Sequence, residues 1–322
     1  MTGYTALHES AAWFDLSSRC KLKITGEDRI HFIHAMSTND VEQLSPGQGV
    51  ETLFLNGRGQ IQAETLALVT EECLLLDFDV RRKKSLPLHL AKYIVMDDVC
   101  TQDISSSLAT IAIEGPLADQ VVAAIASLPP RGKLNHISDH GLRIVRNSLS
   151  SHPGFWLLMP SEKKKKWIKQ IEAANAISAN ADIWNTFRVE NQIPLEGVDY
   201  PDTSIPQQAN RLHAVSFNKG CYLGQEIVER VRSQGNLQKK LEVLEIDTVK
   251  LPPSGSPVVW RDKKIGRLTS PVFSPKIGKV LAFALLRDKL PREGSLIVDG
   301  HSAHIQQNRP VAGTEKEHSH PR

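Results

Sequence analysis

The sequence is most specific at residues 219–226, which read Lys219-Gly220-Cys221-Tyr222-Leu223-Gly224-Gln225-Glu226. This stretch places a cysteine on a glycine-flanked turn, two residues after a lysine, and an apolar stripe with helical spacing follows Gly224. The N-terminus of the predicted helix favours negative charge, and the ammonium group of Lys219 is expected to act in the same direction. Both effects stabilise a thiolate, so Cys221 is predicted to be a nucleophile and a candidate metal ligand.

The other residues of this stretch have expected roles around the thiol. Glycine permits a positive φ or a close approach of the backbone, and Gln225 with Glu226 is expected to shape and cap the following helix. The alternative is an ordinary strand-to-helix turn with an inert cysteine, but it leaves the lysine, tyrosine, glutamine and glutamate without a role. The candidate catalytic residues are Cys221 and Lys219, supported by Gly220, Tyr222, Gly224, Gln225 and Glu226.

A second candidate site is a carboxylate on the apolar face of a predicted helix. Ile183, Phe187 and Glu190 are spaced i, i+4 and i+7 on a helix that begins near Asp182, so Glu190 shares a face with the two apolar residues. An inward carboxylate is costly unless a partner satisfies it. That partner is either a bound ligand or an internal cation such as Arg188.

The order of predicted elements indicates an α+β architecture. Hairpins and helices follow one another without regular βαβ alternation over residues 1–240, which predicts one α+β region there. Short strands separated by Pro, Gly and Asp then predict a small barrel or sandwich over residues 241–310. Residues 311–322 contain almost no apolar residue and are predicted to form a disordered tail.

Composition limits the functional classes. A chain of 322 residues has room for two or three domains, and a net charge of only +3 gives no strong field for nucleic acid or membranes. The four cysteines have no CxxC spacing, which argues against a local zinc or redox motif and for a reducing compartment. No signal peptide is visible, so a cytoplasmic location is expected. We expect Cys20, Cys73 and Cys100 to pack in apolar surroundings.

The stretch at 219–226 resembles the Lys-Gly-Cys-Tyr-x-Gly-Gln-Glu signature of the YgfZ family of folate-binding proteins. That family shares its fold with the T-protein of the glycine cleavage system, an aminomethyltransferase. Shorter matches extend the resemblance over roughly residues 8 to 288, in the expected order. They include Leu55–Ile61 with its Asn-x-x-Gly turn, Ile113–Pro116, Arg188-Val189-Glu190 and Ile265–Ser270.

The resemblance implies a ring-like arrangement of two interleaved α+β lobes around a folate cavity, with a C-terminal barrel. It implies a factor for assembly or repair of iron–sulfur proteins that indirectly supports tRNA thiomethylation. The expected cofactor is tetrahydrofolate or a derivative, and the expected partners are iron–sulfur assembly proteins or client enzymes. By the same resemblance, Glu190 would contact the pterin with Arg188 and Asn56 nearby, and Cys221 would be a transient cluster ligand.

Enzymatic activity stays open, because the resemblance gives no settled reaction. T-proteins carry an Asp-Asp pair after the Asn-x-x-Gly turn, whereas this chain has Ala63 and Glu64 there, so aminomethyl transfer is predicted to be absent. One rival interpretation is a one-carbon transferase that uses Glu64 or Cys221 instead. A second is a tRNA-binding module that uses the lysine run Lys163–Lys166, for which a solvated helix face is the favoured interpretation.

Overall fold

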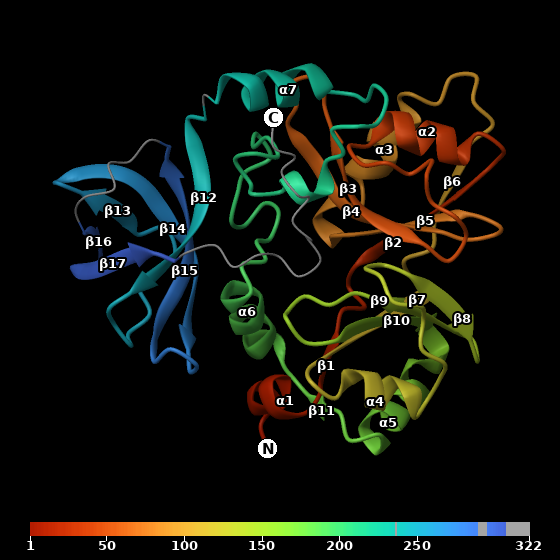
Figure 1. Cartoon of the computed structure of the whole chain (residues 1–322), viewed down its shortest axis with the longest axis horizontal. Helices are drawn as coiled ribbons and strands as arrows, with labels where there is room; N and C mark the ends of the chain where they lie inside the picture. The colour runs from red at the N-terminus through yellow and green to blue at the C-terminus, as the bar shows by residue number, and fades with distance from the viewer. Residues whose placement is uncertain (236, 289–294, 307–322) are drawn as a thin grey trace, which may run out of the picture.

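The computed structural model describes residues 1–235, 237–288 and 295–306. Three lobes surround the 191–224 segment: two sheets with their helices on one side and a barrel on the other (Figure 1). The ring-like α+β architecture and the C-terminal barrel expected from the sequence are confirmed. The 240/241 boundary stays a prediction, and the tail at 311–322 lies outside the described residues.

The first lobe is built on a six-stranded sheet that collects strands from distant parts of the chain. Its central strands are apolar along almost their whole length because helices cover one face and the core of the molecule covers the other. All neighbouring strands are antiparallel except the first pair. The strand order is β11 (Ile177–Ser178), β1 (Ala12–Asp15), β7 (Leu108–Glu114), β10 (Gly154–Pro160), β9 (Leu142–Arg146) and β8 (His136–Asp139).

Four helices pack around this sheet. Apolar residues on α4 (Ala118–Ala123) and α5 (Lys164–Ala173) join the core of one face. Those on α1 (Gly3–Glu9) and α6 (Ala181–Glu190) join the core of the other. A short 3-10 turn, η2 (Ser161–Lys163), precedes α5.

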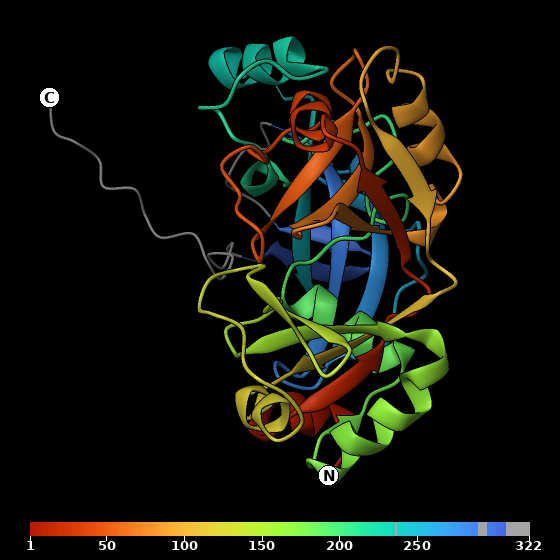
Figure 2. The same ribbon diagram turned by 90° about the vertical axis from the view of Figure 1, so that its right-hand side faces the viewer.

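The second lobe is an antiparallel sheet inserted between β1 and β7 in the sequence, so the two lobes are interleaved (Figure 2). Its core lies against α2 (Arg29–Met36) and α3 (Ser85–Ala91), and η1 (Val80–Arg82) precedes α3. The strand order is β3 (Gly49–Leu55), β4 (Ile61–Val69), β5 (Leu74–Phe78), β2 (Cys20–Thr25) and β6 (Cys100–Asp103).

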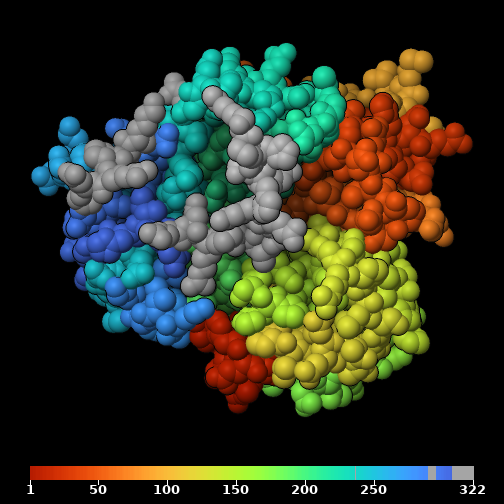
Figure 3. Space-filling model, in the orientation of Figure 1, coloured from red at the N-terminus to blue at the C-terminus, as the bar shows by residue number. Residues whose placement is uncertain are grey.

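The third lobe is a closed barrel with its own apolar core. The 191–224 segment, which contains η3 (Leu212–Ala214), and α7 (Gln225–Gln234) connect it to the other two. The same three lobes form the surface in the space-filling view (Figure 3). The barrel order is β12 (Lys239–Ile246), β15 (Lys279–Arg287), β14 (Lys263–Ser274), β13 (Pro257–Trp260), β16 (Leu296–Val298) and β17 (His301–Ile305).

No helix among the described residues has the length and apolar character needed to cross a membrane.

Candidate functional site

A central cavity of ≈ 120 Å³ lies where the two sheets meet α6 and the 193–214 part of the connecting segment. Strands β3 and β4 supply one wall, and Trp156 on β10 and Trp184 on α6 contribute indole rings. Charged side chains from separate segments complete the lining: Arg19, Glu51, Glu64, Asp79, Glu196, Arg211 and His213.

The carboxylates of β3 and β4 are held in ion pairs. Glu64 accepts a hydrogen bond from Arg211 Nε at 2.6 Å and another from the Tyr200 hydroxyl. Glu51 pairs with His213 Nε2 at 2.9 Å and with Lys133 Nζ at 3.0 Å. Burial alone would raise the pKa of Glu51, but these two partners hold it well below its usual range. Glu51 therefore stays ionised, and the partners of both carboxylates fix them in position.

Glu196 behaves differently from these two carboxylates. Its Oε1 accepts from Arg82 Nε at 2.7 Å and its Oε2 from the backbone N–H of Glu64 at 3.2 Å. Burial, with Glu64 adding repulsion, raises the pKa of Glu196 to about 7 despite the arginine. This carboxyl group can therefore hold or release a proton near neutral pH inside the cavity.

Two polar residues of the lining have buried atoms without a partner. Asn147 Oδ1 and Trp156 Nε1 are both buried and make no hydrogen bond with any described residue. Buried polar atoms are almost always paired, so such exceptions need an explanation. An unpaired acceptor and an unpaired donor on two lining residues are the groups that a ligand with N–H and carbonyl groups would need.

The 219–226 turn lies at the edge of the five-stranded sheet. Lys219 Nζ donates to the carbonyl oxygens of Ser37 at 2.7 Å, Asn39 at 3.1 Å and His34, around the C-terminal end of α2. Burial lowers the pKa of Lys219 to about 8. These three hydrogen bonds hold the turn against α2 and its exit. The expected tuning of the Cys221 thiol by Lys219 stays a prediction.

Cys221 is exposed, and α7 begins only at Gln225. Gln225 Oε1 accepts from the Tyr222 N–H at 3.4 Å, within the turn, and Glu226 places a negative charge in the first turn of α7. No side chain of the described residues caps the helix at Gly224, so the expected capping by Gln225 is not observed. A Cβ added at Gly220 would have ordinary space, because the nearest atom, His34 Nε2, would lie 4.0 Å away.

Gly224 is the glycine of this turn that the structure requires. Its φ is +84°, and a Cβ there would lie 2.5 Å from the Asn56 carbonyl oxygen. The start of α7 therefore packs directly on the β3–β4 turn, and this contact places the preceding cysteine.

Comparison with known families accounts for the whole arrangement. The GCVT N-terminal domain matches residues 2–219, and the glycine cleavage T-protein C-terminal barrel domain matches residues 239–307. The chain belongs to the glycine cleavage T-protein family. The crystal structure of glycine cleavage system aminomethyltransferase T from Bartonella henselae has the same fold. It is 18% identical, with a TM-score of 0.87 over 97% of this chain and 89% of that one.

Relatives by sequence carry transferase names. A protein of Arabidopsis thaliana named "putative transferase, chloroplastic" is 30% identical over 269 residues, which is 80% of this chain and 60% of that protein. An aminomethyltransferase of Exiguobacterium sibiricum is 24% identical over 306 residues, or 92% of this chain and 84% of the relative.

In this T-protein family member, the three residues expected to contact folate do not line the central cavity. Asn56 organises its own turn, accepting from the N–H groups of Arg58 and Gln60. Arg188 pairs with Asp199 at 2.7 Å, and both side chains are almost fully buried. Both side chains have partners within the fold, and their expected role in folate binding stays a prediction.

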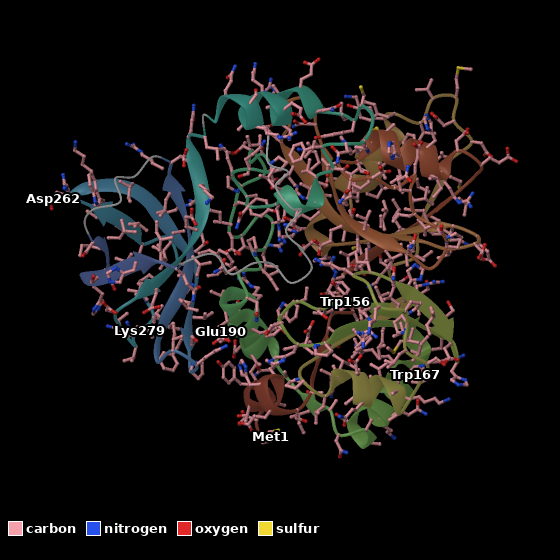
Figure 4. All side chains as sticks on the ribbon, viewed as in Figure 1. Met1, Trp156, Trp167, Glu190, Asp262 and Lys279 are labelled. Carbon is pink, nitrogen blue, oxygen red and sulfur yellow. The ribbon has the colours of Figure 1, made fainter. Side chains whose placement is uncertain are left out.

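Glu190 faces inward, as its spacing predicted, but toward the barrel (Figure 4). It accepts hydrogen bonds from the hydroxyls of Tyr4, at 2.7 Å, and Ser274 of β14. Trp156, which lines the central cavity, lies on β10 of the six-stranded sheet, away from Glu190 in Figure 4. Both hydroxyls donate to Oε1 of Glu190, while Oε2 lies 4.0 Å from His8 Nε2. The role of Glu190 as a pterin ligand stays a prediction.

Sequence reasoning found the position of Glu64 but missed its cavity neighbours Glu51, Glu196, Arg211 and His213. No local pattern pairs them, because their partners lie far away along the chain. Among the other cysteines, Cys20 is buried and Cys73 half-buried, but Cys100 is exposed on β6, so the expectation of apolar surroundings is wrong for Cys100. The described residues contain no group of three or more His, Cys, Asp or Glu suited to a metal ion.

Proposed function

We propose that this protein binds a reduced folate in the central cavity. The observation that supports this most is that two residues of the cavity lining, Asn147 and Trp156, carry an unpaired acceptor and an unpaired donor. A pterin ring is planar and carries both N–H and carbonyl groups, so it suits these atoms and the indole rings of Trp156 and Trp184. A bound reduced folate would supply nitrogen atoms that carry a one-carbon unit.

We further propose that the protein acts, as the YgfZ family does, in assembly or repair of iron–sulfur proteins in the cytoplasm, and so supports tRNA thiomethylation indirectly. Support comes from the complete 219–226 signature and from the exposure of Cys221. A single thiol cannot hold a cluster alone. The cluster is cargo here, and its remaining ligands would come from an assembly protein or client enzyme.

Aminomethyl transfer is the alternative function favoured by the relatives' names. Two features weigh against it. Ala63 lies in the apolar core of the second lobe, and the Glu64 carboxylate is already occupied by Arg211 and Tyr200. A tRNA-binding role has less support, because Lys164 of the lysine run pairs with Asp15.

Titration calorimetry with tetrahydrofolate tests the cavity. Asn147→Leu is expected to weaken binding at least tenfold, because the hydrogen bond offered by the ligand then has no acceptor. Glu162→Gln, an exposed position outside the cavity, serves as the control and should bind like wild type. Equal affinity in wild type and Asn147→Leu would remove the cavity assignment.

Complementation of cells that lack the protein tests the thiol. Cys221→Ser should fold and bind folate but fail to restore iron–sulfur enzyme activities. Cys100→Ser, which also removes an exposed thiol, should restore them fully. Full rescue by Cys221→Ser would mean that the 219–226 stretch only shapes a turn.

A further inference from the structure

A second cavity, of ≈ 310 Å³, lies apart from the central one, between the β4–β5 turn and the strands β7 to β10 of the six-stranded sheet. Neither the folate cavity nor the 219–226 turn contributes to it. Most of its wall is apolar, formed by Leu75, Ile104, Leu108, Leu142, Leu158 and Pro160. Such a wall favours an apolar ligand body over water.

Arg143 on β9 is the one cation among the lining residues of this cleft. Its guanidinium contacts His136 Nδ1 at 3.0 Å, and no carboxylate of the described residues lies within ion-pair distance of it. Burial lowers the pKa of Arg143, and Cys73 and Glu72 offset this only at longer range. By contrast, the cavity and core arginines Arg211 and Arg188 each pair with a carboxylate.

A guanidinium has five N–H donors in a planar fork that matches a carboxylate. Arg143 is half-buried, and an anion placed in the cleft would pair with the N–H groups that His136 does not use. The neighbouring His136 adds no negative charge. The cleft therefore combines an apolar wall with a single unpaired cation.

We propose that this cleft binds a small carboxylic acid with an apolar chain, its carboxylate on Arg143 and its chain along Leu75, Leu142 and Leu158. This site is independent of the proposed folate function. Cys73 lines the same cleft, where its sulfur accepts from the Thr70 hydroxyl at 3.4 Å, so its thiol reports on occupancy.

Octanoate is the probe for calorimetry on the full chain, with octylamine as the cation of equal chain length and acetate as the head group alone. Octanoate should bind wild type, whereas octylamine and acetate should not. Arg143→Gln should weaken octanoate binding at least tenfold, because a charged hydrogen-bonded pair is lost. Arg267→Gln, an exposed arginine of the barrel, is the matched control and should bind like wild type.

Alkylation followed by peptide mapping gives a second readout. Octanoate should slow modification of Cys73 and leave that of the exposed Cys100 unchanged. Equal octanoate affinity in folded Arg143→Gln, octylamine binding as tight as octanoate, or unprotected Cys73 would each overturn the proposal. If Arg143→Gln does not fold, two measurements on the wild-type protein still test the proposal. They are the comparison of octanoate with octylamine and the protection of Cys73 from alkylation.

Discussion

Glu196 shows how the tertiary environment changes the chemistry of one side chain. It is 5% exposed, and the charges that act on it are the cation Arg82, outside the cavity lining, and the anion Glu64. Burial and repulsion outweigh the attraction of the arginine, so the pKa rises from 4.5 to about 7. The folded state therefore binds more protons at this group than the unfolded state does between those two pH values.

We expect the free energy of unfolding of Glu196→Gln, measured relative to wild type, to be higher at pH 8 than at pH 5. The stability that protonated Glu196 contributes is fully present below pH 4.5 and is lost as pH rises through about 7. The difference between the two pKa values corresponds to about 3 kcal/mol. Urea unfolding at both pH values measures it, with the exposed Glu162→Gln as control. A mutant-minus-wild-type difference that does not change with pH would contradict the expectation.

At the scale of elements, the contact between α7 and the β3–β4 turn decides where the cysteine lies. Gly224 caps α7 with a positive φ and touches the Asn56 carbonyl, while Ile227 of the same helix packs close to Gly59. The two segments are far apart in the sequence but form one unit. Residues 219–226 and the Asn-x-x-Gly turn are therefore features of a single contact.

Gly224→Ala should destabilise the protein more than Gly235→Ala at the other end of the same helix. Both glycines have a positive φ, but a Cβ at Gly235 would meet nothing within 4 Å. We expect Gly235→Ala to lower the free energy of unfolding by about 1 kcal/mol, because alanine is strained at a positive φ. Gly224→Ala should lower it at least twice as much, because the backbone around Asn56 must also move. Chemical unfolding of both variants compares them. Equal costs would show that the contact with Asn56 contributes nothing.

At the scale of the whole molecule, a buried polar network joins α6, the connecting segment and the barrel. Arg188 donates to Asp199 and to Ser270 of β14, and Asp199 also accepts from Thr269 at 2.8 Å and from Ser270 at 2.6 Å. Every member is buried. The network ties the barrel to the rest of the fold at one fixed orientation.

Arg188→Gln should destabilise the protein by about 3–5 kcal/mol, because Asp199 is left as a buried, unpaired charge. Arg232→Gln removes a partly exposed partner of Glu229 on α7 and should cost less than about 1 kcal/mol. Urea unfolding followed by tryptophan fluorescence compares the two. Similar costs for both variants would contradict a special role for the buried pair.

The sequence by itself determined the α+β class, the short strands of the C-terminal lobe and the helix after Gly224, because apolar periodicity and turn glycines act over a few neighbouring residues. The closure of the barrel came from the structure. It also placed Glu190 on an inward face. Only the tertiary structure decided what that carboxylate meets, which cysteines are exposed and where the ammonium of Lys219 points. Glu64 and Arg211 are 147 residues apart, and Lys219 and His34 are 185 apart. Partners at such separations are chosen by the packing of the lobes, and no local pattern in the chain records that choice.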